Sequence, residues 1–178
     1  MPSKLVQVNT TTITSNVSSV TLDGIDTGDV YVLVASGLTI TVDTAYLHFR
    51  VTKDVGGTTT SQTATNYAWA NKVITPYTTF GSFRYNTGRS CMYFSNSPLG
   101  ASAGESHNIY YELHNFNSAS EDSYVIVSEN VFNSTASNSY GSQGGLKYMV
   151  AEAHNGITIT GDACQLSGGT LTLYRQVS

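Results

Sequence analysis

Charged residues are scarce in this chain: Asp, Glu, Lys and Arg make up 11% of its 178 residues, well below the usual share of about 25%. The net charge is −4 and no Lys/Arg cluster occurs, which argues against a nucleic-acid partner, because phosphate binding needs a basic surface. No window resembles a membrane span, and the N-terminus lacks the apolar segment of a signal peptide. We therefore expect a protein made in the cytoplasm of its host cell, without membrane insertion.

Cysteine is nearly absent as well. The two that occur, Cys91 and Cys164, are far apart and form no C-x-x-C pair. They could pair across two sheets, but nothing in the sequence points to an oxidising compartment. We expect two buried free thiols.

The sequence also lacks catalytic signatures. G-x-S-x-G, H-E-x-x-H, a phosphate-binding loop and a dinucleotide fingerprint do not occur. Four carboxylates could formally pair for glycoside hydrolysis, but the sequence does not supply the separation on which that mechanism depends: Glu105, Glu112, Asp122 and Glu129. We expect no catalytic residue, no cofactor and no enzymatic activity.

Two sets of residues suggest metal ligands. Asp23, Asp26 and Asp29 could offer oxygens to calcium, but the spacing is not that of an EF-hand and turns favour Asp in any case. Glu112 and His114 share a strand face, and His48 could join them at zinc, but nothing places it nearby. We expect no metal, and we expect surface histidines that are solvated or hydrogen-bonded at His48, His107, His114 and His154.

Ser and Thr are abundant, with 46 residues, alongside 12 Tyr and 16 Gly, a composition typical of β-structure. Residues 29–53 carry the clearest strand pattern in the chain, and the rest of the fold prediction is built around them. Leu47, Phe49 and Val51 alternate with polar residues, which predicts a half-buried strand over 44–52. Residues 30–34 are apolar at every position, which predicts a strand at the centre of a sheet over 30–35, followed by a short strand over 38–41.

The whole pattern predicts an all-β fold: a single antiparallel β-sandwich, jelly-roll-like, of about 8–11 strands over residues 18–178. Residues 1–17 are predicted to form an N-terminal arm or an edge strand. Long loops are expected over 54–65, 95–106 and 133–145, and a hairpin over 108–132. The predicted core consists of Leu33, Leu47, Phe49, Val51, Ile109, Leu113, Ile126, Leu171 and Leu173.

Residues 76–85 are dense in aromatic side chains. Exposed rings stack on sugar faces, so Tyr77, Phe80, Phe83 and Tyr85 are candidate glycan contacts. The alternative is a loop folded over the open end of the sandwich. Trp69 shares a strand face with Tyr67, Asn71 and Val73 and is expected to pack between the sheets.

The chain resembles small β-sandwich structural proteins of tailed-bacteriophage virions, especially those of environmental and marine phages. The resemblance spans residues 18–177 and is carried by SSVTLDGIDTGDVYVLVAS, YLHFRV, TATNYAW, YYELHNF, GSQGG and the closing SGGTLTLYRQ. The closing strand is the most specific of these. The chain departs from the pattern after Tyr174, where such proteins more often have Gly.

This resemblance implies a non-enzymatic virion protein, most simply a capsid decoration (cement) protein or a head-fibre component. The alternative is a tail-fibre, receptor-binding or carbohydrate-binding module that contacts a host surface glycan. Implied partners are other copies of the chain, as a homotrimer, and the major capsid protein. Leu5, Val6 and Val8 are the candidate assembly arm, which would pair with a neighbour by strand addition.

Overall fold

The segments with alternating apolar and polar residues form long strands in the computed structural model. The structure describes residues 4–74, 83–93, 99–133 and 138–177. At residues 83–85, 133, 138 and 139 it describes the backbone only. This part of the chain contains no helix. The strands are β1 (Lys4–Ile13), β2 (Ser19–Asp23), β3 (Tyr31–Ile40), β4 (Tyr46–Val55), β5 (Thr58–Ser61), β6 (Tyr67–Ile74), β7 (Phe83–Arg89), β8 (Met92–Tyr93), β9 (Ser106–His114), β10 (Ser123–Asn133), β11 (Asn138–Tyr148), β12 (Gly156–Asp162) and β13 (Leu166–Val177).

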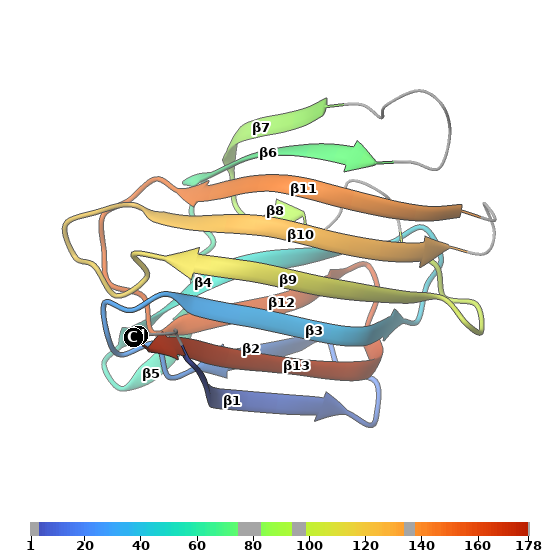
Figure 1. Cartoon of the computed structure of the whole chain (residues 1–178), viewed down its shortest axis with the longest axis horizontal. Coiled ribbons are helices and arrows are strands. Elements are labelled where there is room, and N and C mark those ends of the chain that lie inside the picture. The colour runs from blue at the N-terminus through green and yellow to red at the C-terminus, as the bar shows by residue number, and fades with distance from the viewer. Residues whose placement is uncertain (1–3, 75–82, 94–98, 134–137, 178) are drawn as a thin grey trace.

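These strands form two antiparallel sheets that pack face to face, which confirms the all-β sandwich. The larger sheet has the order β1-β13-β3-β9-β10-β11-β6-β7, and the smaller has β2-β12-β4-β5 with β8 paired to β4. Figure 1 shows the larger sheet in front, from β7 at the top to β1 at the bottom. The chain passes repeatedly from one sheet to the other along its length.

The core lies between the sheets and uses the residues that the alternation predicts. Leu47, Phe49 and Val51 of β4 are each at most 1% exposed. Trp69 is buried on one face of β6 together with Tyr67, Asn71 and Val73, as predicted. The other confirmed members of the predicted core are Leu33, Ile109, Leu113, Leu171 and Leu173.

The prediction for Ile126 is wrong, because its side chain is 54% exposed on the outer face of the larger sheet. Its neighbours Val125 and Val127 point inward instead. Residues 124–127 are apolar at all four positions, so period two alone cannot decide which set faces the core. Pairing with β9 decides it, since Val127 lies opposite the buried Tyr111 and Val125 lies opposite the buried Leu113.

The two predicted strands over 30–35 and 38–41 are one strand, β3. Its pairing with β9 is irregular between Ala35 and Leu38, and Gly37 has a φ of +62° there. A bulge of this kind lets the strand bend without ending. The predicted central position is confirmed, because β3 lies between β13 and β9.

Two of the three predicted long loops are corrected. Residues 54–65 contain the tight hairpin of β4 and β5, which turns at Gly56 and Gly57 with φ of +63° and +83°. Two consecutive positive φ angles suit the two-residue turn that a twisted hairpin favours. Residues 138–148 form β11, so the described part of the chain contains thirteen strands in place of the expected eight to eleven. One glycine of β11 has a packing reason, because a Cβ on Gly144 would lie 2.3 Å from the carbonyl oxygen of Ala70.

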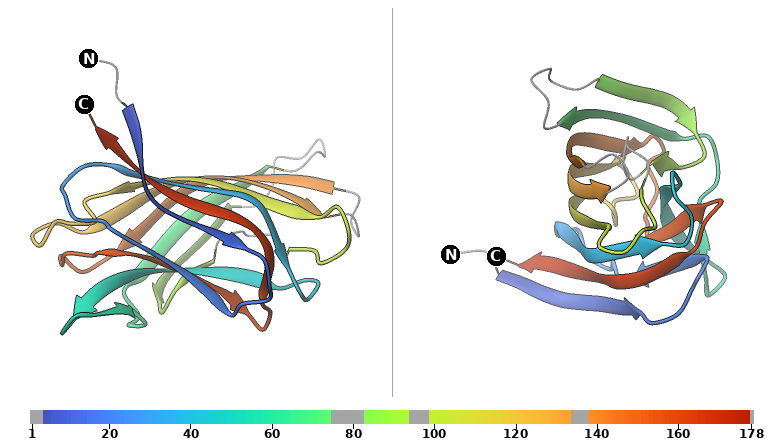
Figure 2. Two further views of the ribbon diagram at one scale, coloured as in Figure 1. Left: turned by 90° about the horizontal axis from the view of Figure 1, so that it is seen from below. Right: turned by 90° about the vertical axis from the view of Figure 1, so that its right-hand side faces the viewer.

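The N-terminal segment is an edge strand. β1 pairs with β13 along its length, from Lys4 opposite Val177 to Ile13 opposite Gly169, and Ile13 is buried. The amide of Asn9 donates to Asp23 Oδ1 at 2.7 Å, which ties β1 to the smaller sheet. Figure 2 shows the first part of β1 and the last part of β13 running side by side away from the two packed sheets. We call residues 4–7 of β1 with residues 174–177 of β13 the terminal ribbon; on its other side, β13 still pairs with β3 at Tyr174 and Arg175.

Candidate functional site

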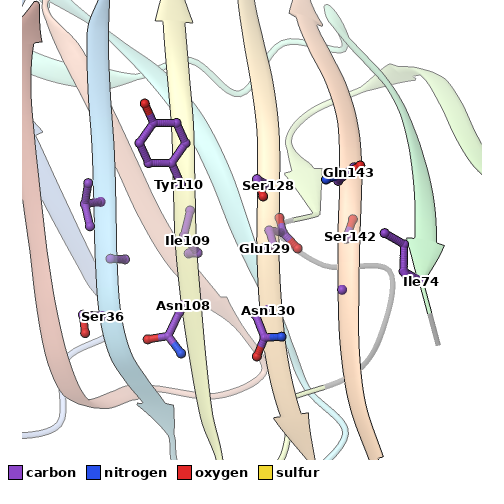
Figure 3. A pocket seen from close by; sticks show the side chains of 13 residues that line it. Ser36, Ile74, Asn108, Ile109, Tyr110, Ser128, Glu129, Asn130, Ser142 and Gln143 are labelled. Carbon is purple, nitrogen blue, oxygen red and sulfur yellow. The ribbon is translucent and has the colours of Figure 1, made fainter. Parts of the chain in front are cut away.

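A shallow depression of about 490 Å³ lies on the outer face of the larger sheet. Strand register builds it from two neighbouring rows of side chains. In one row Ser128 lies between Tyr110 and Gln143, and in the other Asn130 lies between Asn108 and Gly141. Figure 3 shows these side chains on β9, β10 and β11, with Ser36 of β3 on one side and Ile74 of β6 on the other.

The floor is low because its residues are small. Gly141 lies between Asn130 and Ile74 and contributes no side chain, and Ser128 contributes only a hydroxymethyl group. The higher residues around them are Tyr110, which is 44% exposed, and Ile74, which is 41% exposed. A Cβ on Gly141 would lie 3.5 Å from Ile74 Cβ, an ordinary contact, so the hollow reflects the absence of a side chain and not a crowded backbone.

Neighbouring hydrogen bonds orient two of these side chains. Asn108 Oδ1 accepts the backbone N–H of Gly37 at 2.9 Å, at the bulge of β3. The Tyr110 hydroxyl donates to Glu112 Oε1 at 3.4 Å along β9. Partial burial, followed by the negative charge of Glu112, raises the pKa of Tyr110, so the phenol stays a neutral donor.

Among the residues that line the depression, Glu129 alone is acidic or basic, and its side chain is fully buried on the inner side of β10. Lys72, opposite Gln143, and Glu112, bonded to Tyr110, lie next to these residues on the outer face. The surface therefore offers amide and hydroxyl groups, which donate and accept hydrogen bonds, beside an exposed ring and an isoleucine. Such a surface suits a neutral polar ligand better than an ion.

Beneath the depression, Glu129 belongs to a buried polar cluster that the sequence did not predict. The Tyr111 hydroxyl donates to Glu129 Oε1, and His107 Nε2 lies 3.7 Å from Glu129 Oε2. Burial raises the pKa of Glu129, and His107 and Tyr111 oppose that rise. The expectation of a surface histidine is wrong at His107, which is completely buried.

A second cluster joins two loops at one end of the sandwich. His154 is 1% exposed, again contrary to the surface expectation, and its Nδ1 lies 2.9 Å from Ser123 Oγ. Its backbone N–H donates to the Phe116 carbonyl at 2.6 Å. Glu152 Oε1 lies 3.6 Å from His154 Nε2, and Glu152 also accepts a hydrogen bond from Lys53 at 2.6 Å. Burial lowers the pKa of His154 to about 4, so its ring is neutral at pH 7.

This second cluster has the residue types of a Ser–His–acid triad. In a working triad Nε2 faces the serine and Nδ1 faces the acid, whereas here Nδ1 faces Ser123. Ser123 is 1% exposed, so a substrate has no access to its hydroxyl. The cluster holds the loop after β9 against the loop after β11 and is structural.

The side chains of the four aromatic residues proposed as glycan contacts lie outside the described part of the structure, so that proposal stays a prediction. Tyr77 and Phe80 lie outside the described residues. Phe83 and Tyr85 belong to β7, paired with Lys72 and Ala70 of β6, and not to a loop; their side chains also lie outside the described part.

The three aspartates near the first turn each accept a hydrogen bond. Asp26 accepts one from the Tyr31 hydroxyl at 3.0 Å and Asp29 one from the Thr27 hydroxyl at 2.9 Å, both local contacts of the kind that a turn interpretation predicts. The bond to Asp23 comes from Asn9 of β1 and joins two strands.

The zinc alternative requires residues from different sheets. His48 lies on β4 of the smaller sheet, 3.5 Å from Asp162, whereas Glu112 and His114 lie together on β9, 3.5 Å apart. Within the described ranges, no group of three or more His, Cys, Asp or Glu residues could hold a metal ion.

The remaining predicted residues are engaged separately. Glu105 accepts the Ser102 N–H at 2.7 Å, and Asp122 pairs with Lys147 at 2.6 Å. The prediction of two buried free thiols is confirmed at Cys91, whereas Cys164 is a free thiol that is only half-buried.

Comparison with known proteins adds no relative: no family model, curated protein or solved structure matches this chain. The features of the described residues that bear on function are the depression, a second hollow of about 490 Å³ on the same sheet around Tyr124, Ile126 and Gly145, the terminal ribbon and the exposed apolar residues. Apart from the ribbon, most of the exposed apolar side chains lie on the outer face of the larger sheet, among them Ile74, Tyr110, Tyr124, Ile126 and Phe132.

Proposed function

We propose that this chain is a structural protein of a tailed-bacteriophage virion that decorates the capsid exterior and attaches through the terminal ribbon. The sequence resemblance over residues 18–177 supports the class of protein. The observation that carries the mode of attachment is the outer strand of the ribbon, an edge strand in which Leu5 is 47% and Val6 37% exposed.

The ribbon has the chemistry of an assembly contact. β1 is the last strand of its sheet, so within the described chain the outer edge of residues 4–7 has no strand beside it. Such an edge presents backbone N–H and C=O groups to which a neighbouring chain can add a strand. Burying Leu5 and Val6 in the same contact adds a hydrophobic contribution.

The partners of this contact are the major capsid protein and other copies of the chain, arranged as a trimer. The trimer follows from the resemblance, since threefold positions are common sites for decoration proteins. A long antiparallel sandwich suits the role mechanically, because β13 continues from the ribbon into the larger sheet, where it lies between β1 and β3.

The test compares variants in their binding to virions. Leu5→Lys with Val6→Lys places two charges on the ribbon, and Val55→Lys, at a residue 58% exposed on the β4–β5 hairpin, is the matched control. We expect wild type and Val55→Lys to co-sediment with particles that lack the chain, and the double variant to stay in the supernatant. Because all three positions are exposed, the melting temperatures should agree within a few degrees.

Full occupancy by the double variant would contradict attachment through the ribbon. Failure of the wild-type chain itself to bind particles would contradict the virion role.

A further inference from the structure

The depression on the larger sheet carries an inference that does not depend on the virion proposal. Its polar groups come from neighbouring strands about 4.8 Å apart, with Asn108 on β9, Asn130 on β10 and Gln143 on β11. Amide side chains donate from nitrogen and accept at oxygen. Three of them within one hollow match a ligand that carries many hydroxyl groups, each of which also donates and accepts.

The scarcity of charge at the depression favours a neutral ligand. The one acidic or basic side chain among the lining residues, Glu129, lies on the inner side of the sheet with no exposed side-chain surface. An anionic ligand would find no cation among the lining residues and would lose hydration without an opposite charge in return. A neutral ligand avoids that cost.

Tyr110 adds a stacking surface. Its ring is 44% exposed, and its hydroxyl is held by Glu112, so the ring is positioned before a ligand arrives. The face of an aromatic ring accommodates the apolar C–H face of a sugar while the hydroxyls at the rim reach the amides. Ile74 supplies an apolar contact on the opposite side of the hollow.

We propose that this depression binds a neutral oligosaccharide, with Tyr110 stacking on a sugar ring and Asn108, Asn130 and Gln143 binding its hydroxyls. The site differs from the Tyr77–Tyr85 segment proposed from the sequence. It lies on a regular sheet, where neighbouring strands fix the positions of the binding groups before the ligand arrives.

Two glycines of β11 provide a matched pair of variants. Gly141 lies in the depression and Gly145 lies outside it, four residues along the same strand and on the same face. Neither has a positive φ, and a Cβ would meet its nearest neighbour at 3.5 Å at Gly141 and at 3.6 Å at Gly145. Gly141→Leu therefore fills the depression, while Gly145→Leu leaves it open.

The experiment is binding of the full chain to an array of immobilised neutral and acidic oligosaccharides, followed by calorimetric titration with the strongest neutral binder. We expect saturable binding to a neutral oligosaccharide, roughly tenfold or more weaker in Gly141→Leu and in Tyr110→Ala. Gly145→Leu should bind like wild type.

Thermal melting first establishes that each variant folds; if Gly141→Leu does not, Tyr110→Ala decides, because it truncates an exposed side chain. The proposal is overturned if wild type binds no neutral oligosaccharide or prefers acidic ones. It is also overturned if the folded variants that alter the depression bind as tightly as wild type. Since the assay uses the isolated chain, its failure leaves the virion proposal untouched.

Discussion

At His154, burial controls a single proton. The imidazole packs edge-on against Tyr148 and Phe116. Burial is the largest cause of its low pKa of about 4; the charge of Glu152 opposes this shift and that of Lys53 adds to it. In the unfolded chain the same residue has a pKa near 6.5. The unfolded chain therefore takes up a proton between pH 6.5 and about 4 that the folded chain does not.

This difference predicts acid sensitivity. The stabilisation is complete above pH 6.5 and is lost as the pH falls toward 4, by roughly 3 kcal/mol in the free energy of unfolding. His154→Gln lacks the titrating group, so its stability should change less over this interval, although its stability at pH 7 is lower. Urea unfolding at a series of pH values measures both slopes, and parallel slopes in the two proteins would contradict the assignment.

Among the strands, β4 and β10 show what alternation can and cannot decide. In β4 polar residues separate the apolar ones, and the inward face was predicted correctly at Leu47, Phe49 and Val51. In β10 four consecutive residues are apolar, so alternation does not show which of them face the core, and the prediction for Ile126 is wrong. The register between β10 and β9 determines which face of β10 is buried, and the sequence pattern of a single strand carries no information about that register.

A pair of substitutions tests these faces. Phe49→Ala removes a completely buried ring and should lower the free energy of unfolding by about 3–5 kcal/mol. Ile126→Ala removes an exposed side chain and should change it by less than about 0.5 kcal/mol. Chemical denaturation measures both changes, provided that the slope of unfolding free energy against denaturant concentration is the same in all variants. A large loss of unfolding free energy in Ile126→Ala would mean that β10 turns its other face to the core.

The same limit explains why the sequence did not reveal the candidate site. Ser36, Asn108, Asn130 and Gln143 lie up to 107 residues apart in the chain, and only the strand order brings them together. Gly141 was assigned to a loop because its segment is rich in Gly and Ser. It is in fact the floor of the depression, since β10 and β6 pair with its strand on both sides.

The molecule as a whole combines a low content of charged residues, a sandwich of two sheets and the terminal ribbon. The outer face of the larger sheet carries mainly neutral polar and apolar side chains, with Lys72, Glu112 and Lys147 among the few charged ones. The ribbon lies at the end of β1 and β13 where Lys4 pairs with Val177 (Figure 2). The two proposals use different parts of this arrangement, the ribbon for attachment and the sheet for ligand.

The central claim is that this chain is part of a virion, and imaging of purified particles tests it most directly. Antibodies raised against the folded chain, carrying gold, should label the capsid exterior of the phage whose genome encodes it, at many positions on each particle. Intact particles that carry no label, while infected cells contain the chain in soluble form, would contradict the claim.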